Sequence, residues 1–386
     1  MKILTITYGF PSEHEPYHGI FVLRQMQALM ALGDEFRVLR AIPYRPWWVR
    51  PWAKQQPRRL PDRYEYDGVK VRVVGGLAPP RLYGLELLRR QIKAAIEAEV
   101  RAFQPDLIHA HRILAAGYLA VDRDRPVVIT AHGGDAYATP YQRSGLRRAA
   151  RHVLSRADEL VAVSRFIQKH LIRLGAQRST VVYNGADENV FYPRAREASR
   201  RRFGIEADRF VVSFAGNLVT AKGTNEFAAA LVRLADLRPI ALIAGTGANQ
   251  VPMAGTLQAG GIEARFLGSV DHETLADVYG AADAVALPSY YEGFPAVVCE
   301  AMLSGRAIVT TPVGGIPEIV VHGGNGILVS PRDSRGLAEA LRQVFRSPDF
   351  KEHLERRARC DARERLTWSA NARAYRNVYA RAVAHA

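Results

Sequence analysis

The chain has 386 residues, of which 48% are hydrophobic and 24% are charged, with 31 glycines and 21 prolines. This composition excludes a disordered protein and is typical of a globular α/β protein long enough for two domains. The net charge of +15 is concentrated in the first half, because residues 1–190 carry 29 basic against 18 acidic side chains.

A basic surface favours nucleic acid, anionic lipid or phosphorylated substrates as partners. The sequence contains no nucleic-acid-binding motif, so we expect no nucleic acid partner. Only two cysteines occur, Cys299 and Cys360, which predicts neither a disulfide framework nor a zinc site. The first strand starts at Lys2 with no signal segment before it, and no apolar run is long enough to span a membrane. We therefore expect a cytoplasmic protein.

Strands and helices alternate in the first half in the pattern of a doubly wound fold. Strands are predicted at 2–7, 36–42, 107–110, 127–130 and 160–163, and helices at 20–30, 82–103 and 143–154. Ser164 follows the last of these strands and is predicted to cap the next helix. The loop after the first strand ends at Gly19, where the backbone can approach a phosphate.

The loop at 43–54 holds three of the four tryptophans, among them Trp47 and Trp48, and three prolines. Tryptophan beside arginine suits a bilayer interface, where rings lie at headgroup level and cations meet anionic lipid. The same rings can instead form an acceptor pocket or pack on the core of their own domain. The basic helix at 143–154 has similar alternatives: a membrane face, a face for an acceptor phosphate, or an ordinary solvated face.

Two more loops of the first half carry candidate residues. The strand at 127–130 leads to His132, two glycines and Asp135, so His132 can reach a ligand beyond the end of the strand. A histidine with only a structural role is the alternative. Asp122 and Asp124 formally match a metal-binding Asp-x-Asp pattern, but they lie in a charged loop. We therefore interpret them as a solvated turn and expect no bound metal.

The second half begins after a linker at about 188–200 and repeats the alternation. Strands are predicted at 210–214, 240–244, 284–287 and 307–310. Gly245 forms a tight turn where a nucleotide can pass close to the backbone, and Asp271 is predicted to cap a helix. Gly314 and Gly315 form a further loop that can approach a ligand without a side-chain clash.

The most informative stretch runs from 288 to 305. A buried strand ends before Pro288, and a loop leads to a helix that Pro295 suits at its first position, where a missing N–H costs nothing. The amides of Ala296 and Val297 then point out of the helix start. They form a predicted site for an anion such as a diphosphate.

Two carboxylates flank this anion site, Glu292 in the loop and Glu300 within an otherwise apolar helix. A carboxylate in apolar surroundings needs hydrogen-bond donors, which the hydroxyls of a sugar or ribose supply. The alternative is a loop glutamate and a helix glutamate that both reach solvent. Eight residues span about 12 Å along one helix, more than the acid–nucleophile pair of a glycosidase allows. We therefore predict that both bind ligand hydroxyls.

Glu292 and Glu300, with Gly293, Phe294 and Pro295 between them, resemble the signature of the family 4 retaining glycosyltransferases. The order of segments is similar along nearly the whole chain. The resemblance implies an α/β fold of GT-B type, with two facing Rossmann-like domains and an interdomain cleft. The acceptor-side domain would comprise residues 1–190 and a crossover helix at 366–386, and the nucleotide-sugar domain residues 191–365.

The resemblance also implies roles for single residues. His132 would contact the donor sugar, Lys222 would hold the donor diphosphate, and Asn217 stands where the family usually has an arginine. His132, Glu292 and Lys222 would be the catalytic residues, and Asp135, Trp47 and Trp48 would lie on the acceptor side. The implied donor site is Gly19, Gly216, Asn217, Lys222, Gly245, Val270, Glu292, Gly293, Phe294, Pro295, Ala296, Val297 and Glu300.

The implied reaction moves a hexose-type sugar from a UDP- or GDP-sugar to a glycan or lipid-linked acceptor with retention of anomeric configuration. It would use no metal and no other cofactor, and the enzyme would be cytoplasmic, at the inner face of an anionic membrane. Two alternatives stay open: an epimerase or hydrolase that consumes the donor without an acceptor, and a non-catalytic binding protein. A phosphorylase is disfavoured, because the context of a pyridoxal-binding lysine is not evident.

Overall fold

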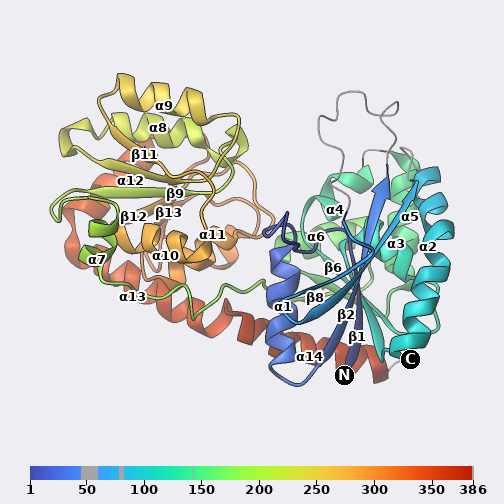
Figure 1. The fold of residues 1–386 in the computed structure, drawn as a ribbon. Helices are drawn as coiled ribbons and strands as arrows, with labels where there is room; N and C mark the ends of the chain where they lie inside the picture. Colours follow the sequence, from blue (N-terminus) through green and yellow to red (C-terminus); the bar gives the residue numbers. More distant parts are fainter. Residues whose placement is uncertain (45–59, 78–81, 142, 385–386) are drawn as a thin grey trace. The chain divides into compact units, whose positions relative to one another are not determined.

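The structure, a computed structural model, describes residues 1–44, 60–77, 82–141 and 143–384 (Figure 1). It consists of two compact units. The first comprises Met1–Asn184 and Asn371–Ala386, and the second comprises Gly185–Ala370. From the sequence, we placed the end of the first domain at 190, against Asn184 here, and the return of the chain to it at 366, against Asn371. Within the described ranges, no helix combines the length and the apolar composition that a membrane crossing requires.

The first unit contains an eight-stranded sheet in the order β3-β4-β2-β1-β5-β6-β7-β8. All pairings are parallel except that between β3 and β4. The chain reverses its direction of travel across the sheet between β1 and β5, and ligands of doubly wound folds bind at such a switch point. The strands are β1 (Lys2–Thr7), β2 (Glu35–Tyr44), β3 (Arg63–Tyr66), β4 (Val69–Leu77), β5 (Leu107–His111), β6 (Val127–Ala131), β7 (Glu159–Ala162) and β8 (Thr180–Val181).

The helices of this unit follow the sequence pattern closely. Ser164 caps α6 as predicted, because its Oγ accepts a hydrogen bond from the Ile167 N–H at 3.2 Å. Gly175 ends the same helix in the left-handed conformation. The helices are α1 (Ile20–Met30), α2 (Leu82–Phe103), α3 (Tyr118–Ala120), α4 (Gly134–Tyr137), α5 (Ser144–Arg156), α6 (Arg165–Leu174) and α14 (Trp368–Ala384).

The antiparallel pair β3–β4 was not predicted, although the sequence contains its signal. Asp67 and Gly68 connect the two strands, and both have positive φ, +48° and +77°. An Asp-Gly turn with two positive φ values matches the right-handed twist of a hairpin. Tyr64 then pairs with Val71 at the edge of the sheet.

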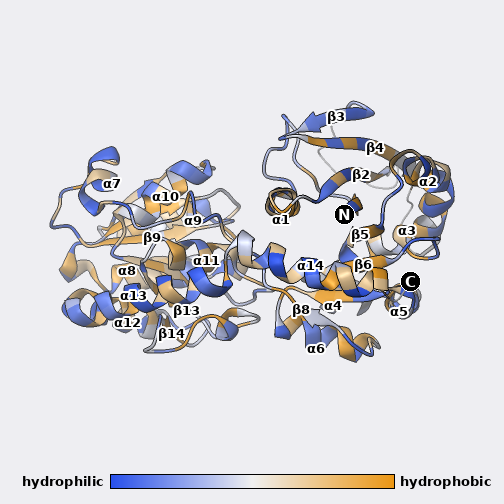
Figure 2. Ribbon diagram, turned by 90° about the horizontal axis from the view of Figure 1, so that it is seen from below, coloured by the Kyte–Doolittle hydropathy of each residue, from blue (hydrophilic) through white to orange (hydrophobic). Residues whose placement is uncertain are grey.

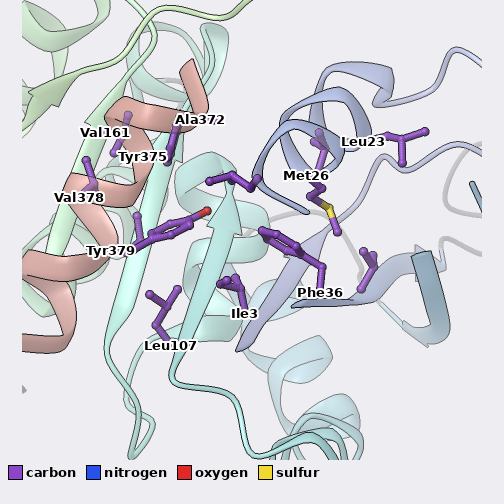
Figure 3. Packing of buried hydrophobic residues seen from close by; sticks show 14 of the residues in the cluster. Ile3, Leu23, Met26, Phe36, Leu107, Val161, Ala372, Tyr375, Val378 and Tyr379 are labelled. Carbon is purple, nitrogen blue, oxygen red and sulfur yellow. The ribbon is translucent and has the colours of Figure 1, made fainter. Parts of the chain in front are cut away.

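 Helices α1 and α14 share one face of the first sheet, although they come from opposite ends of the chain. Side chains of both helices belong to one hydrophobic core. Figure 3 shows Tyr379 of α14 and Met26 of α1 converging on the strands that carry Ile3 and Leu107. Because Tyr379 is fully buried, the last helix of the chain completes the core of the first unit.

The second unit contains a six-stranded parallel sheet in the order β11-β10-β9-β12-β13-β14. This is the strand order of a dinucleotide-binding fold, with the switch point between β9 and β12. Every residue of β9, β10, β12 and β13 is buried, as expected for parallel strands covered on both faces. The strands are β9 (Val211–Ala215), β10 (Ile240–Ala244), β11 (Glu263–Phe266), β12 (Ala284–Leu287), β13 (Ala307–Thr310) and β14 (Ile327–Leu328).

Amphipathic helices cover this sheet. In Figure 2 strand β9 is hydrophobic, whereas α12 and α13 alternate between hydrophilic and hydrophobic turns. Asp271 caps α10 as predicted, accepting a hydrogen bond from the Thr274 N–H at 2.7 Å. The helices are α7 (Arg196–Arg202), α8 (Thr224–Val232), α9 (Gln250–Ala259), α10 (His272–Ala281), α11 (Ala296–Leu303), α12 (Ser334–Arg346) and α13 (Pro348–Arg365).

Candidate active site

An ion pair lies at the switch point of the second unit. Lys222 follows β9 and Glu292 follows β12, and the Lys222 Nζ is 2.6 Å from the Glu292 Oε1. The Ser289 hydroxyl donates to the same oxygen at 2.8 Å. Glu292 is buried, with 6% of its surface exposed. The structure therefore brings together two of the three residues predicted to be catalytic.

Glycines hold the Glu292 loop between its neighbours. Gly223 has a φ of +71°, and a Cβ on it would lie 2.0 Å from the Pro288 carbonyl oxygen. Gly314 has a φ of +58°, and a Cβ on it would lie 1.6 Å from the carbonyl oxygen of Glu292. No side chain fits at either distance, so both close approaches require glycine. The position of Glu292 is thus fixed from two sides by backbone.

Helix α11 begins one residue later than predicted. Pro295 has φ −89° and ψ 99°, an extended conformation, and its carbonyl accepts from the Val298 N–H at 3.2 Å. It is therefore the N-cap residue, and the prediction of Pro295 as the first helical residue was wrong. The amides of Ala296 and Val297 remain at the helix start and have no partner among the described residues, as an anion site requires.

Glu300 lies on α11 and receives a hydrogen bond from a neighbouring helix. The hydroxyl of Tyr279 on α10 donates to the Glu300 Oε2 at 3.0 Å, and Tyr279 is fully buried. Desolvation raises the pKa of the half-buried Glu300 carboxyl to about 7, and the bond from Tyr279 opposes this shift. Within the described residues the Glu300 Oε1 has no hydrogen-bond partner, so it can accept from a ligand hydroxyl.

The remaining predicted donor residues of the second unit lie on consecutive loops at the same edge of the sheet. A Cβ on Gly245, whose φ is +136°, would lie 1.9 Å from the Gly216 carbonyl oxygen, so the loops after β9 and β10 touch through their backbones. The Gly245 N–H donates to the Gly268 carbonyl at 2.7 Å, and this bond connects the loop after β10 to the loop after β11. Asn217 is exposed and Val270 is half-buried on these loops.

In the first unit, a pocket of about 310 Å³ opens at the carboxyl ends of β5 and β6. Its position beside the switch point between β1 and β5 is where doubly wound folds bind ligands. His132, the third predicted catalytic residue, lies in its wall. The lining also includes Tyr8, Arg112, Leu114, Gly133, Gly134, Asp135 and Thr139.

His132 is paired with a second histidine that the sequence did not single out. The His111 Nδ1 and the His132 Nε2 are 3.0 Å apart, joining the ends of β5 and β6. Burial lowers the pKa of His111 to about 3 and that of His132 well below its usual range, and the nearby Arg112 adds to both shifts. Both rings are therefore neutral at physiological pH. The other ring nitrogen of His132, Nδ1, is buried and has no hydrogen-bond partner among the described residues.

Asp135, predicted on the acceptor side, lines the same pocket and also binds backbone amides of two loops. Its Oδ1 accepts from the N–H groups of His132 at 3.1 Å and Gly133 at 2.8 Å, and its Oδ2 accepts from Ile113 at 3.2 Å. The carboxylate therefore connects the loops after β5 and β6. Desolvation raises its pKa, and the three amide bonds oppose the rise.

Three further predicted features lie in loops of the first unit. Gly19 precedes α1 with a φ of +76°, and a Cβ on it would lie 2.2 Å from the Gly9 carbonyl oxygen, so this loop folds tightly on itself. Asp122 accepts bonds from Arg156 at 2.9 Å and Arg89 at 3.2 Å, which makes it part of a surface ion-pair cluster. The predicted acceptor-side residues Trp47 and Trp48 lie outside the described residues.

The sequence matches two family models along most of its length. Residues 19–190 match the model described as glycosyltransferase family 4, and residues 195–361 match glycosyl transferases group 1. A relative from Bacillus subtilis (strain 168), provisionally named as the teichuronic acid biosynthesis glycosyltransferase TuaC, is 32% identical over 353 residues, 88% of each chain. The chain belongs to the GT4-type glycosyltransferases.

Solved structures agree with this family at the level of the fold. Sucrose-phosphate synthase from Thermosynechococcus elongatus is 22% identical, with a TM-score of 0.79 over 100% of each chain. Alr3699/HepE from Anabaena, in complex with UDP, is 21% identical, with a TM-score of 0.75 over 98% of this chain and 100% of that one. The glycosyltransferase therefore has the GT-B fold, as the sequence predicted.

Proposed function

We propose that this glycosyltransferase transfers a hexose-type sugar from a UDP- or GDP-sugar to a glycan or lipid-linked acceptor, with retention of anomeric configuration. The observation that carries the proposal is the Lys222–Glu292 pair of 2.6 Å at a switch point, in the loop that leads to the open amides of α11. A cation and helix amides stabilise a departing diphosphate. Crystals of HepE with UDP and with UDP-glucose support a nucleotide-sugar donor.

The roles of the donor-side residues follow from their contacts. Lys222 and the amides of Ala296 and Val297 would neutralise the diphosphate, and Glu292 would accept from a sugar hydroxyl while Lys222 and Ser289 hold it. Glu300 would accept from the ribose hydroxyls through the oxygen that Tyr279 leaves open. With Lys222 and these helix amides at the phosphates, the proposed reaction uses no metal and no other cofactor.

Retention would follow from attack on the face that the phosphate leaves. In this proposal the departing phosphate takes the proton of the acceptor hydroxyl, so no protein nucleophile is needed. His132, neutral and fixed by His111, would bind a hydroxyl of the transferred sugar. The enzyme would work in the cytoplasm, where the basic first half of the chain would meet an anionic membrane that presents the acceptor.

A panel of nucleotide sugars tests the proposal, with a chelator present throughout. We expect one donor class to bind and to be hydrolysed slowly without acceptor, with the released sugar keeping its configuration. Glu300→Gln should weaken nucleotide binding, whereas Glu339→Gln on the exposed side of α12 serves as a matched control. Donor consumption that no acceptor accelerates would indicate a hydrolase or epimerase. No binding of any nucleotide would end the proposal.

A further inference from the structure

We propose that the pocket beside His132 binds an oxyanion of the acceptor, a phosphate or a carboxylate, through Arg112. The inference rests on the proposed function, because it assigns this pocket to the acceptor and the second unit to the donor. It goes further in naming the chemical class of the acceptor and the residue that selects it.

Charge in the pocket is the first observation. Arg112 and Asp135 are the charged side chains among the lining residues. Both oxygens of Asp135 are taken by the amides of Ile113, His132 and Gly133. The guanidinium of Arg112 is exposed and forms no ion pair within the described residues. Arg112 thus presents a planar set of donors that matches a carboxylate or phosphate.

The backbone at Arg112 is the second observation. Arg112 has a φ of +85°, which is in the left-handed region that non-glycine residues rarely adopt. It also begins a π-helical turn, Arg112–Gly117, directly after β5. Strained residues and π-turns of this kind gather at functional sites. Glycine would adopt this φ without strain. An arginine at this position carries a conformational cost, which a ligand bound by its side chain would offset.

The other walls of the pocket suit a sugar that carries such an anion. Tyr8 and Thr139 add hydroxyl groups, so hydroxyls of a saccharide find partners beside the guanidinium. The volume of about 310 Å³ is at the lower end for ligand pockets, which fits one saccharide unit. The donor diphosphate would have its own cation, Lys222, and its own helix amides in the second unit.

Binding measurements separate the anion from the sugar and from the donor. The probes are inorganic phosphate, glucose 6-phosphate, glucuronate, glucose and UDP, titrated by calorimetry into the full chain at constant ionic strength. The variants are Arg112→Gln, Arg112→Gly and, as a matched control, Arg148→Gln on the exposed face of α5. Arg112→Gly keeps the backbone conformation, because glycine adopts a φ near +85° freely.

We expect both Arg112 variants to bind glucose 6-phosphate or glucuronate, whichever the wild type binds, at least tenfold more weakly than the wild type does. Glucose and UDP should change less than twofold, and Arg148→Gln should change none of the probes. Preference for one of the two anionic sugars identifies the phosphate or the carboxylate as the natural group. The inference would be overturned if the wild type bound neither anionic sugar or bound them no better than glucose, and also if the Arg112 variants lost UDP binding. Failure of the wild type to bind any nucleotide would refute the proposed function separately.

Discussion

Removing the Tyr279 hydroxyl tests how Glu300 recognises a nucleotide. Tyr279→Phe deletes one oxygen from a fully buried ring and leaves the packing around it in place. What it removes is the 3.0 Å hydrogen bond to the Glu300 Oε2. Because this bond favours the ionised carboxylate, its loss should raise the pKa of Glu300 above its present value of about 7.

The size of the effect can be estimated. A hydrogen bond to a charged group contributes about 1.5 kcal/mol or more, and one pKa unit corresponds to about 1.4 kcal/mol. The pKa of Glu300 should therefore rise by about one unit. At pH 7 the ionised fraction would fall from roughly a half to roughly a tenth, so UDP affinity should fall about fivefold and recover near pH 9.

Calorimetric titration of UDP between pH 6 and 9 measures this shift. The control ligand is 2′,3′-dideoxy-UDP, which keeps the titrating phosphates and lacks the hydroxyls that Glu300 would bind. We expect the midpoint to move upward in Tyr279→Phe for UDP alone. An unchanged midpoint would show that Tyr279 has only a packing role, and equal binding of both ligands by the wild type would remove Glu300 from ribose recognition.

The same carboxyl group should make stability depend on pH. Its pKa in the folded state, about 7, lies above the ordinary value of 4.5. Between these values the folded state holds a proton that the unfolded state has lost, so this group's contribution to stability falls as pH rises from 4.5 to 7. Urea unfolding at pH 5 and pH 8 should show a smaller difference for Glu300→Gln than for the wild type. An equal difference would contradict the titration.

Four more substitutions have defined outcomes. Lys222→Ala should weaken UDP binding at least tenfold by calorimetry, and Glu292→Ala should lower kcat more than it weakens UDP; the reverse order would contradict their roles. Gly314→Ala should lower the free energy of unfolding in urea by about 2 kcal/mol or more, because its Cβ would lie 1.6 Å from the Glu292 carbonyl oxygen. An unchanged free energy of unfolding would mean that the two loops can move apart. Tyr379→Phe should cost about 1 kcal/mol, since its hydroxyl is 2.9 Å from the His109 Nδ1; no change in unfolding midpoint would refute this.

The central strands of both sheets were predicted well from the sequence, for a physical reason, whereas β4, β8, β11 and β14 near the edges were not predicted. Strands covered on both faces are continuous apolar runs, and 2–7, 240–244 and 307–310 have the bounds of β1, β10 and β13. Pro295 was misplaced by one residue, because proline suits a helix start in more than one position. The β3–β4 hairpin was not predicted, although the Asp67-Gly68 pair is typical of a two-residue hairpin turn.

Contacts between distant residues could not be predicted. The pairing of Lys222 with Glu292 depends on β9 and β12 being neighbours, which the order of strands decides. The pairing of His111 with His132 depends on where adjacent strands end. Spacing along the chain marks which residues carry chemistry, whereas sheet topology decides which of them meet.

Helix α14 has a consequence for how the protein is made. The first unit needs Tyr375 and Tyr379 for its core, yet the ribosome adds these residues only after the whole second unit. At roughly 5–20 residues per second, the first 184 residues wait on the order of ten seconds or more for their last helix. During that interval the nascent amino-terminal half exposes an apolar sheet face, so a chaperone that shields it, or early folding of the second unit alone, is expected during synthesis.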